Sequence, residues 1–319
     1  MKGLTLKQLR YFEALARHGH FGRAAEACAI SQPALSMQIR DLEEAFGAPL
    51  FERGARQVRL TGFGEEVALR LRDILRGVDE LEDLARASRD RLAGRLRIGV
   101  IPTVAPYLLP AIVGDLTRAH EGLDVRVRET VTPKLLTELS EGRLDTAILA
   151  LPVSEPALEE VALFTEAFVL VRPGAEAGRP VPSAETLARM RLLLLEEGHC
   201  FRDQALSFCD LGATRGPGRP RDLLDGSSLS TLVQMVAAGI GVTLIPEMAV
   251  PVETRSADVA VARFPEPQPS RTIGMVWRRS SPLSDRLHEV AEAVRRAAGG
   301  PGTVGGGAPR PGPPPVALA

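Results

Sequence analysis

The feature that most constrains this chain is a long helical pattern without proline between Gly64 and Arg91. Apolar residues recur there at alternating spacings of four and three, which is the heptad pattern of a helix that packs against another helix. A helix that joins two domains has no obvious internal surface to cover, so we expect it to pair with a second copy of the chain. Packing against the chain's own body is the alternative. The residues of this heptad stripe are Val67, Leu71, Ile74, Val78, Leu81 and Ala85.

The long helix divides a chain of 319 residues, about twice the usual length of one domain. We predict a head over residues 1–62, a linker helix over 63–92, an α/β body over 93–298 and a tail over 299–319. The tail contains 7 glycines and 6 prolines and cannot bury enough apolar surface to fold. We therefore expect it to be disordered.

The head has the pattern of three short helices followed by a wing. A first helix begins near Thr5 and ends at Gly19, and a second covers 21–28. Ser31 is placed to cap a third helix, in whose first turn Pro33 is tolerated. Residues 49–53 and 57–60 then form two short extended segments around Gly54. The buried stripe of the third helix is Leu35, Ile39, Leu42 and Phe46.

The outer face of the third helix carries side chains that suit DNA. Gln32, Ser36 and Arg40 share this face, and such groups bond adenine, phosphate and guanine, respectively. The chain's net charge is −1, but residues 1–60 hold nine Lys and Arg against six Asp and Glu. A solvated face on a helical bundle is the alternative. The predicted DNA contacts are Ser31, Gln32, Pro33, Ser36 and Arg40 of the helix and Arg53, Arg56 and Arg59 of the wing.

From Arg95 onward, strand and helix patterns alternate, which predicts an α/β domain with parallel strand pairing. The predicted helices cover 107–117, 134–139, 229–238 and 283–298. The predicted strands cover 96–101, 125–130, 146–151, 168–172, 192–195, 242–245 and 272–277.

Several classes of protein are excluded. The longest apolar runs fall far short of the roughly 20 residues of a membrane span, and the N-terminal residues lack the apolar core of a signal peptide, so we expect a cytoplasmic protein. The cysteines Cys28, Cys200 and Cys209 are too few for a disulfide scaffold and lack the spacing of a zinc site. We expect neither a metal nor a cofactor.

Cys200 and Cys209 lie nine positions apart. In a helix they would be roughly 13 Å apart along the axis, whereas a disulfide needs Cα atoms within about 7 Å. A helix and this disulfide therefore exclude one another, and oxidation would refold the segment. His199 and Arg202 are expected to favour the Cys200 thiolate. The alternative is that both cysteines are small buried apolar residues.

The head and linker contain a set of motifs: Leu9 to Phe12, Phe21 to Ala25, Ser31 to Ser36, Leu42-Glu43, Leu50 to Arg53 and Leu60-Thr61. Through these motifs the head resembles that of LysR-type transcriptional regulators. The resemblance covers residues 4–92, linker helix included, and implies a body similar to two-lobed periplasmic binding proteins. It also implies a homodimer or homotetramer on double-stranded promoter DNA, with RNA polymerase as a further partner.

The body resembles the peroxide-sensing branch of that family through residues 98–110, 197–204 and 271–274. This resemblance implies an activator of oxidative-stress genes in which hydrogen peroxide oxidises Cys200, Cys209 then forms the disulfide, and a thiol-reducing system resets the pair. A Gly-, Pro- and Arg-rich segment, 212–220, and the tail depart from the branch. The implied peroxide-binding residues are Thr103, Thr132, His199, Asp203 and Arg271.

Each of these residues also has a plain structural interpretation. Thr103 could cap the following helix, Thr132 precedes a helix-starting proline, and Arg271 could pair with a carboxylate. Two other functions are alternatives: a LysR-type regulator that senses a metabolite in the cleft between the lobes, and a thiol peroxidase. A DNA-binding head argues against an enzyme.

Overall fold

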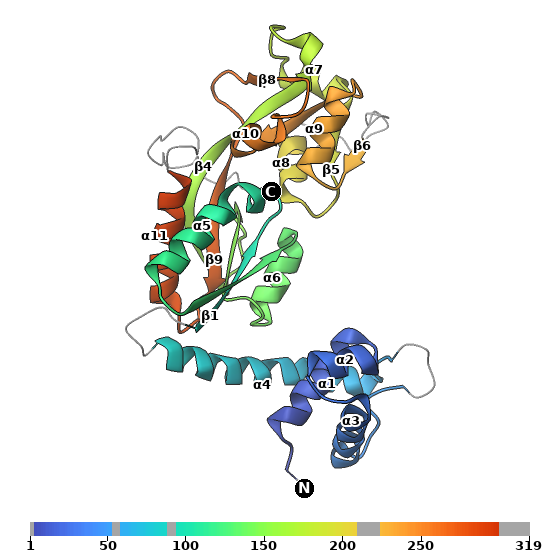
Figure 1. Cartoon of the computed structure of the whole chain (residues 1–319). Helices are drawn as coiled ribbons and strands as arrows, with labels where there is room; N and C mark the ends of the chain where they lie inside the picture. The colour runs from blue at the N-terminus through green and yellow to red at the C-terminus, as the bar shows by residue number, and fades with distance from the viewer. Residues whose placement is uncertain (1–2, 53–57, 88–93, 209–223, 300–319) are drawn as a thin grey trace. The chain divides into compact units, whose positions relative to one another are not determined.

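The computed structural model describes residues 3–52, 58–87, 94–208 and 224–299 (Figure 1). The chain divides into two compact units, Met1–Ala85 and Arg86–Ala319. None of the described helices combines the length and apolar composition that a membrane span needs. The helices of the first unit are α1 (Leu6–His18), α2 (Phe21–Ala27), α3 (Gln32–Phe46) and most of α4 (Gly62–Ala87).

Capping residues set the helix ends of the head. Ser31 Oγ accepts a hydrogen bond from Ala34 N at 3.3 Å, which confirms the predicted cap of α3. Gly19 and Gly47 end α1 and α3 with left-handed backbones (φ 58° and 71°), a conformation that glycine adopts at low cost. The wing begins and ends where Phe51 pairs with Leu60 in an antiparallel bridge.

The core of the head extends into α4. Leu71 and Leu75 of α4 are 3% and 6% exposed and pack with the apolar residues of α1 and α3. This corrects the predicted heptad stripe at Leu71, which is buried within its own chain. Ile74 and Leu81 are 51% and 66% exposed, so they remain available to a partner.

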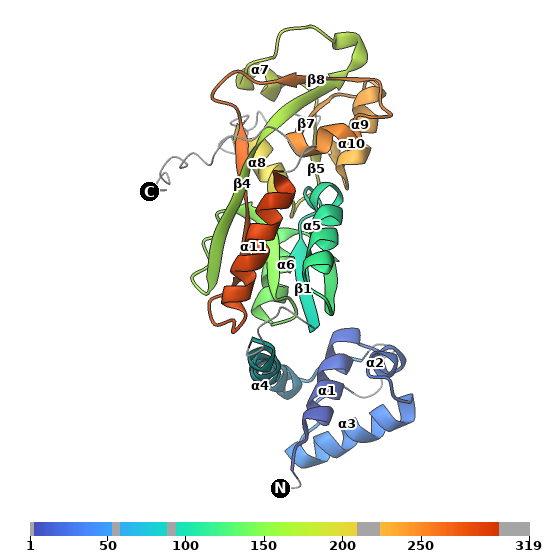
Figure 2. The ribbon, with the colours of Figure 1, turned by 60° about the vertical axis from the view of Figure 1, so that its left-hand side comes forward.

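The described strands of the second unit form one nine-stranded sheet, in the order β2-β1-β3-β9-β4-β7-β5-β6, with β8 paired to β4. The long strand β4 pairs with β9 through its first half and with β7 and β8 through its second (Figure 2). The strands are β1 (Gly94–Val100), β2 (Leu123–Glu129), β3 (Thr146–Leu151), β4 (Leu158–Pro173), β5 (Leu192–Leu195), β6 (Leu224–Gly226), β7 (Val242–Pro246), β8 (Val259–Arg263) and β9 (Ser270–Arg278).

Two separate apolar cores divide this unit into two lobes, as predicted. The first lobe is built on β1, β3 and β9 with α5, α6 and α11, and the second on β5 and β7 with α7, α8 and α9. The helices are α5 (Ala105–Ala119), α6 (Thr132–Ser140), α7 (Ala184–Arg189), α8 (Cys200–Phe208), α9 (Leu229–Ala237), α10 (Val250–Glu253) and α11 (Ser284–Ala298), with single 3₁₀ turns at Gly174–Glu176 and Glu247–Ala249.

The predicted parallel pairing is wrong for the centre of the sheet. Strands β1, β2 and β3 pair in parallel, as do β5, β6 and β7, but β9 is antiparallel to both β3 and β4. The chain crosses between the lobes along β4 and returns along β9, and two such crossings must run in opposite directions. The α/β class itself is confirmed.

Candidate functional site

A small pocket lies where the two lobes meet. Strands β1 and β2 are parallel neighbours, so the chain leaves both at the same edge of the sheet. Thr103 lies in the loop after β1, and Thr132 is the first residue of α6, which follows β2. Helix α8 of the second lobe begins there at Cys200. Cys200 packs against the core of the first lobe, although Phe201 belongs to that of the second. The pocket is lined by Ile101, Pro102, Thr103, Val131, Thr132, His199, Cys200 and Phe201.

Two threonines line this pocket. Thr132 Oγ1 is buried and has no hydrogen-bond partner among the described residues. Thr103 is 2% exposed, and its Oγ1 accepts a bond from Arg271 Nη1 at 2.8 Å, which leaves its own hydrogen available as a donor. The idea that Thr103 caps a helix is wrong, because the cap residue of α5 is Val104.

Arg271 lies behind Thr103 rather than in the pocket lining. Its Nη2 is 2.6 Å from Oε1 of Glu166 and 3.1 Å from the Thr103 carbonyl oxygen. The ring centre of Phe201 lies 5.2 Å from the guanidinium carbon, within the range of a cation–π contact. The carboxylate partner expected for Arg271 is therefore Glu166. Arg271 fixes the position of Thr103 while joining β9, β4 and α8.

His199 is half-buried beside Cys200. Burial lowers the pKa of its imidazole below the usual value, although Glu196 opposes this effect. Burial therefore favours the neutral imidazole, the form that carries no positive charge toward Cys200. Arg202 is buried and donates to the Leu195 carbonyl and the Asp225 carboxylate, at 2.7 and 2.5 Å.

The expected stabilisation of the Cys200 thiolate by His199 and Arg202 therefore lacks support. Cys200 is the first residue of α8. Asp203 is exposed on α8 and does not line the pocket. Cys209 lies outside the described residues.

The head presents the expected outer face on α3. Ser31, Gln32, Pro33 and Arg40 are exposed, and Ser36 is half-buried. Arg40 Nη2 lies 3.5 Å from Ser36 Oγ. In the wing, Arg59 is exposed, whereas Arg53 and Arg56 lie outside the described residues.

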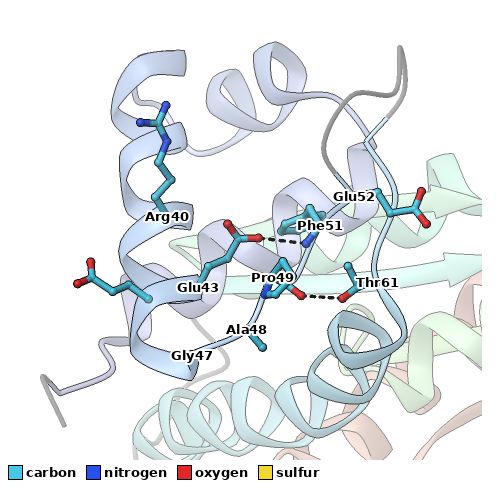
Figure 3. Close-up of a pocket in the computed structure, with 9 residues that line it drawn as sticks. Arg40, Glu43, Gly47, Ala48, Pro49, Phe51, Glu52 and Thr61 are labelled. Atoms are coloured by element: carbon cyan, nitrogen blue, oxygen red, sulfur yellow. Dashed lines mark hydrogen bonds between the residues drawn. The ribbon is translucent and has the colours of Figure 1, made fainter.

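Glu43 fastens the wing to α3. One of its carboxylate oxygens accepts a bond from the backbone N–H of Leu50 at 2.8 Å. The same oxygen accepts a bond from the backbone N–H of Phe51 at 3.2 Å (Figure 3). Thr61 Oγ1 donates to the Pro49 carbonyl at 2.8 Å and thereby joins the segment that leaves the wing to the segment that enters it. The sequence motif contained Glu43 without revealing this role, because its partners lie beyond the end of the helix.

Comparison with known protein families agrees with this architecture. Residues 6–65 match the bacterial regulatory helix-turn-helix protein, lysR family, and residues 89–299 match the LysR substrate binding domain. The chain belongs to the LysR family of bacterial transcriptional regulators, which are not enzymes.

Similar proteins within that family include peroxide regulators. The chain is 43% identical to the DNA-binding transcriptional dual regulator OxyR of Escherichia coli K12 over 297 residues, 92% of this chain and 95% of the relative. It is 43% identical to a probable hydrogen peroxide-inducible genes activator of Streptomyces viridosporus over 299 residues, 92% of this chain and 94% of the relative.

Solved structures of OxyR have the same fold. A full-length OxyR variant from Pseudomonas aeruginosa superposes with a TM-score of 0.72 at 36% identity, covering 93% of this chain and 96% of that one. A hydrogen peroxide-bound OxyR variant from Corynebacterium glutamicum gives a TM-score of 0.63 at 34% identity, covering 92% of each chain.

Proposed function

We propose that this chain is a DNA-binding activator of oxidative-stress genes that hydrogen peroxide switches through a reversible Cys200–Cys209 disulfide. The main observation behind the proposal is the pocket that Cys200 lines together with Thr103 and Thr132, whose buried hydroxyl has no partner among the described residues. The similarity to peroxide regulators supports it.

The size and polarity of the pocket favour hydrogen peroxide over a metabolite. Pockets that hold drug-sized molecules usually measure about 300–1,000 Å³, whereas this one has no room for a molecule of that size. Hydrogen peroxide has two oxygen atoms, each able to donate and to accept a hydrogen bond. A ligand oxygen that accepts a bond from Thr132 would satisfy the partnerless buried hydroxyl.

The first chemical step oxidises Cys200. Its thiolate attacks one oxygen of hydrogen peroxide, the O–O bond breaks, and the departing hydroxide takes up a proton to become water. The product is a sulfenic acid at Cys200. Two threonine hydroxyl groups can stabilise the negative charge that develops on the departing oxygen.

The second step forms the disulfide and requires α8 to unwind. The Cys209 sulfur attacks the sulfenic sulfur and a second water molecule leaves. In the reduced helix, the Cα atoms of Cys200 and Phe208 are about 12 Å apart. A disulfide needs Cα atoms within about 7 Å, and Cys209 follows Phe208 directly in the sequence, so an intact α8 is incompatible with the bond.

The remaining parts act on promoter DNA. The face of α3 that bears Gln32 and Arg40 reads base edges in the major groove, and the wing arginines, Arg53, Arg56 and Arg59, contact phosphates. The exposed residues Ile74 and Leu81 of α4, with the half-buried Val78 between them, join copies of the chain into a dimer and then a tetramer. Refolding of α8 changes the packing of these subunits on the promoter and thereby their contact with RNA polymerase. Cellular dithiol reductants in the cytoplasm return the pair to thiols.

A peptide map under non-reducing conditions tests the switch. The full-length chain, treated with sub-stoichiometric hydrogen peroxide, should yield a peptide that links positions 200 and 209. Cys209→Ser should accumulate sulfenic acid at Cys200, and Cys200→Ser should not respond. A response retained by Cys200→Ser would refute the peroxide mechanism and favour a metabolite sensor.

DNA reading is tested separately. Gln32→Ala should lower the discrimination between promoter and random DNA by about 1–3 kcal/mol, because a bidentate contact to a base is lost. Arg59→Ala should weaken binding to all sequences alike. Unchanged selectivity in Gln32→Ala would show that this face of α3 does not read bases.

A further inference from the structure

One large apolar side chain on α3 faces away from the core of the head. Met37 is 56% exposed, whereas Leu35, Ile39 and Leu42 of the same helix are at most 3% exposed. Met37 takes no part in the apolar core of the head. Nothing within the described chain therefore accounts for an apolar residue at this position.

Its place on the helix is next to the predicted base-reading side chains. Met37 lies four residues after Pro33 and three before Arg40, so these three exposed residues share one side of α3. The stripe formed by Gln32, Ser36 and Arg40 runs directly beside it. The apolar side chains of Pro33 and Met37 thus lie beside the hydrogen-bonding side chains of Gln32 and Ser36 within the first three turns of the helix.

This pairing matches the chemistry of the major groove. Among the four bases, thymine alone presents an apolar group there, its C5-methyl, whereas hydrogen-bonding groups line the rest of the groove. The unbranched, polarisable side chain of methionine adapts well to such a contact. The N-terminal half of a recognition helix, where Met37 lies, is the part that reaches base edges.

We propose that Met37 is a specificity-determining residue that contacts the methyl group of a thymine in each half-site. The inference rests on the proposed function, since it requires α3 to occupy the major groove. It adds an apolar contact to the hydrogen-bonding contacts of Gln32 and Arg40. Because Met37 covers no core residue, its replacement by alanine should leave the unfolding temperature of the chain unchanged.

Replacement of thymine by deoxyuridine tests the contact, because it removes the methyl group alone. The full-length chain first enriches binding sites from a random duplex library, and each thymine of the enriched site is then replaced singly. At one thymine per half-site, the replacement should weaken binding by the wild-type chain about fourfold, the effect of one apolar carbon losing its contact. The same replacement should not affect Met37→Ala.

Two controls define the outcome. Met37→Leu should retain the thymine preference, and Val252→Ala, which trims an apolar side chain that is 55% exposed in the body, should behave as the wild type. Equal effects of deoxyuridine on the wild type and Met37→Ala at every position would overturn the inference while leaving DNA reading by α3 intact. Failure to enrich any sequence would overturn both.

Discussion

At the scale of single residues, we expect the buried hydroxyl of Thr132 to contribute to the oxidation of Cys200 and not to the stability of the fold. Its Oγ1 has no hydrogen-bond partner in the described part of the chain, and such a group costs free energy in the folded protein. Thr132→Val should therefore unfold at the same or a higher temperature than the wild type. It should nevertheless slow sulfenic acid formation at Cys200 by about tenfold, the effect of losing one hydrogen bond in the transition state.

Thr132→Ser is the matched control, because it keeps the hydroxyl and removes only a methyl group. Oxidation can be followed by trapping the sulfenic acid in a Cys209→Ser background. A lower unfolding temperature with an unchanged oxidation rate in Thr132→Val would show that the hydroxyl serves the fold and not the reaction.

His199 makes stability depend on pH. Burial lowers the pKa of its imidazole in the folded protein, so the unfolded chain binds the proton more tightly than the folded one. The contribution of a neutral His199 to stability is therefore complete above the unfolded pKa of about 6.5 and declines as the pH falls below it. His199→Gln should lose less stability than the wild type between pH 7.5 and 5.5. Urea unfolding at both pH values measures this difference, and parallel losses in the two proteins would contradict it.

At the scale of secondary structure elements, α4 serves two purposes. Leu71→Asp places an unpaired charge in the core of the head and should unfold it. Ile74→Asp lies on the exposed side and should leave the head folded while weakening association of the chains. Sedimentation at micromolar concentration distinguishes the two. Wild-type mass in a folded Ile74→Asp variant would show that this surface does not pair chains.

Elements with a strong local pattern were predictable from the sequence. The helix α3 has a cap, a buried stripe and a glycine end in consecutive residues, and β3 and β5 are continuous apolar runs. The first half of β4 was missed because glutamates interrupt its apolar residues, and its strand conformation depends on pairing with β9 about 110 residues later. The antiparallel direction of β9 likewise follows from tertiary pairing and not from its own sequence.

At the site, too, some residues were predictable from the sequence and others depend on tertiary pairing. Family resemblance supplied Thr103, Thr132, His199 and Cys200, which line one pocket. Glu166, the partner of Arg271, has no local signature, because the two residues are separated by 105 positions and meet only when β4 pairs with β9.

At the scale of the whole second unit, a hydrogen-bonded bridge joins the lobes. The Tyr107 hydroxyl of α5 donates to Glu253 of α10 at 2.6 Å, and Ser230 of α9 donates to the other carboxylate oxygen at 2.6 Å. The ring of Tyr107 packs against both apolar cores. Tyr107→Phe should keep this packing and lose the bond, which lowers stability by about 1 kcal/mol.

Thermal unfolding measures this change, with Ser230→Ala as a control that removes only the exposed donor. Tyr107→Phe should unfold at a temperature several degrees lower, and Ser230→Ala should change less. An unchanged unfolding temperature for Tyr107→Phe would show that packing alone holds the lobes together.

The central claim is that α8 is helical in the reduced protein and unwinds when Cys200 joins Cys209. Amide hydrogen exchange across residues 201–208 of the full-length chain tests it most directly, in the reduced and the disulfide forms at one pH and temperature. The account predicts protected amides in the reduced form and a marked loss of protection in the disulfide form, with the strands β1 and β3 unchanged. Equal protection of residues 201–208 in a verified disulfide form would contradict it.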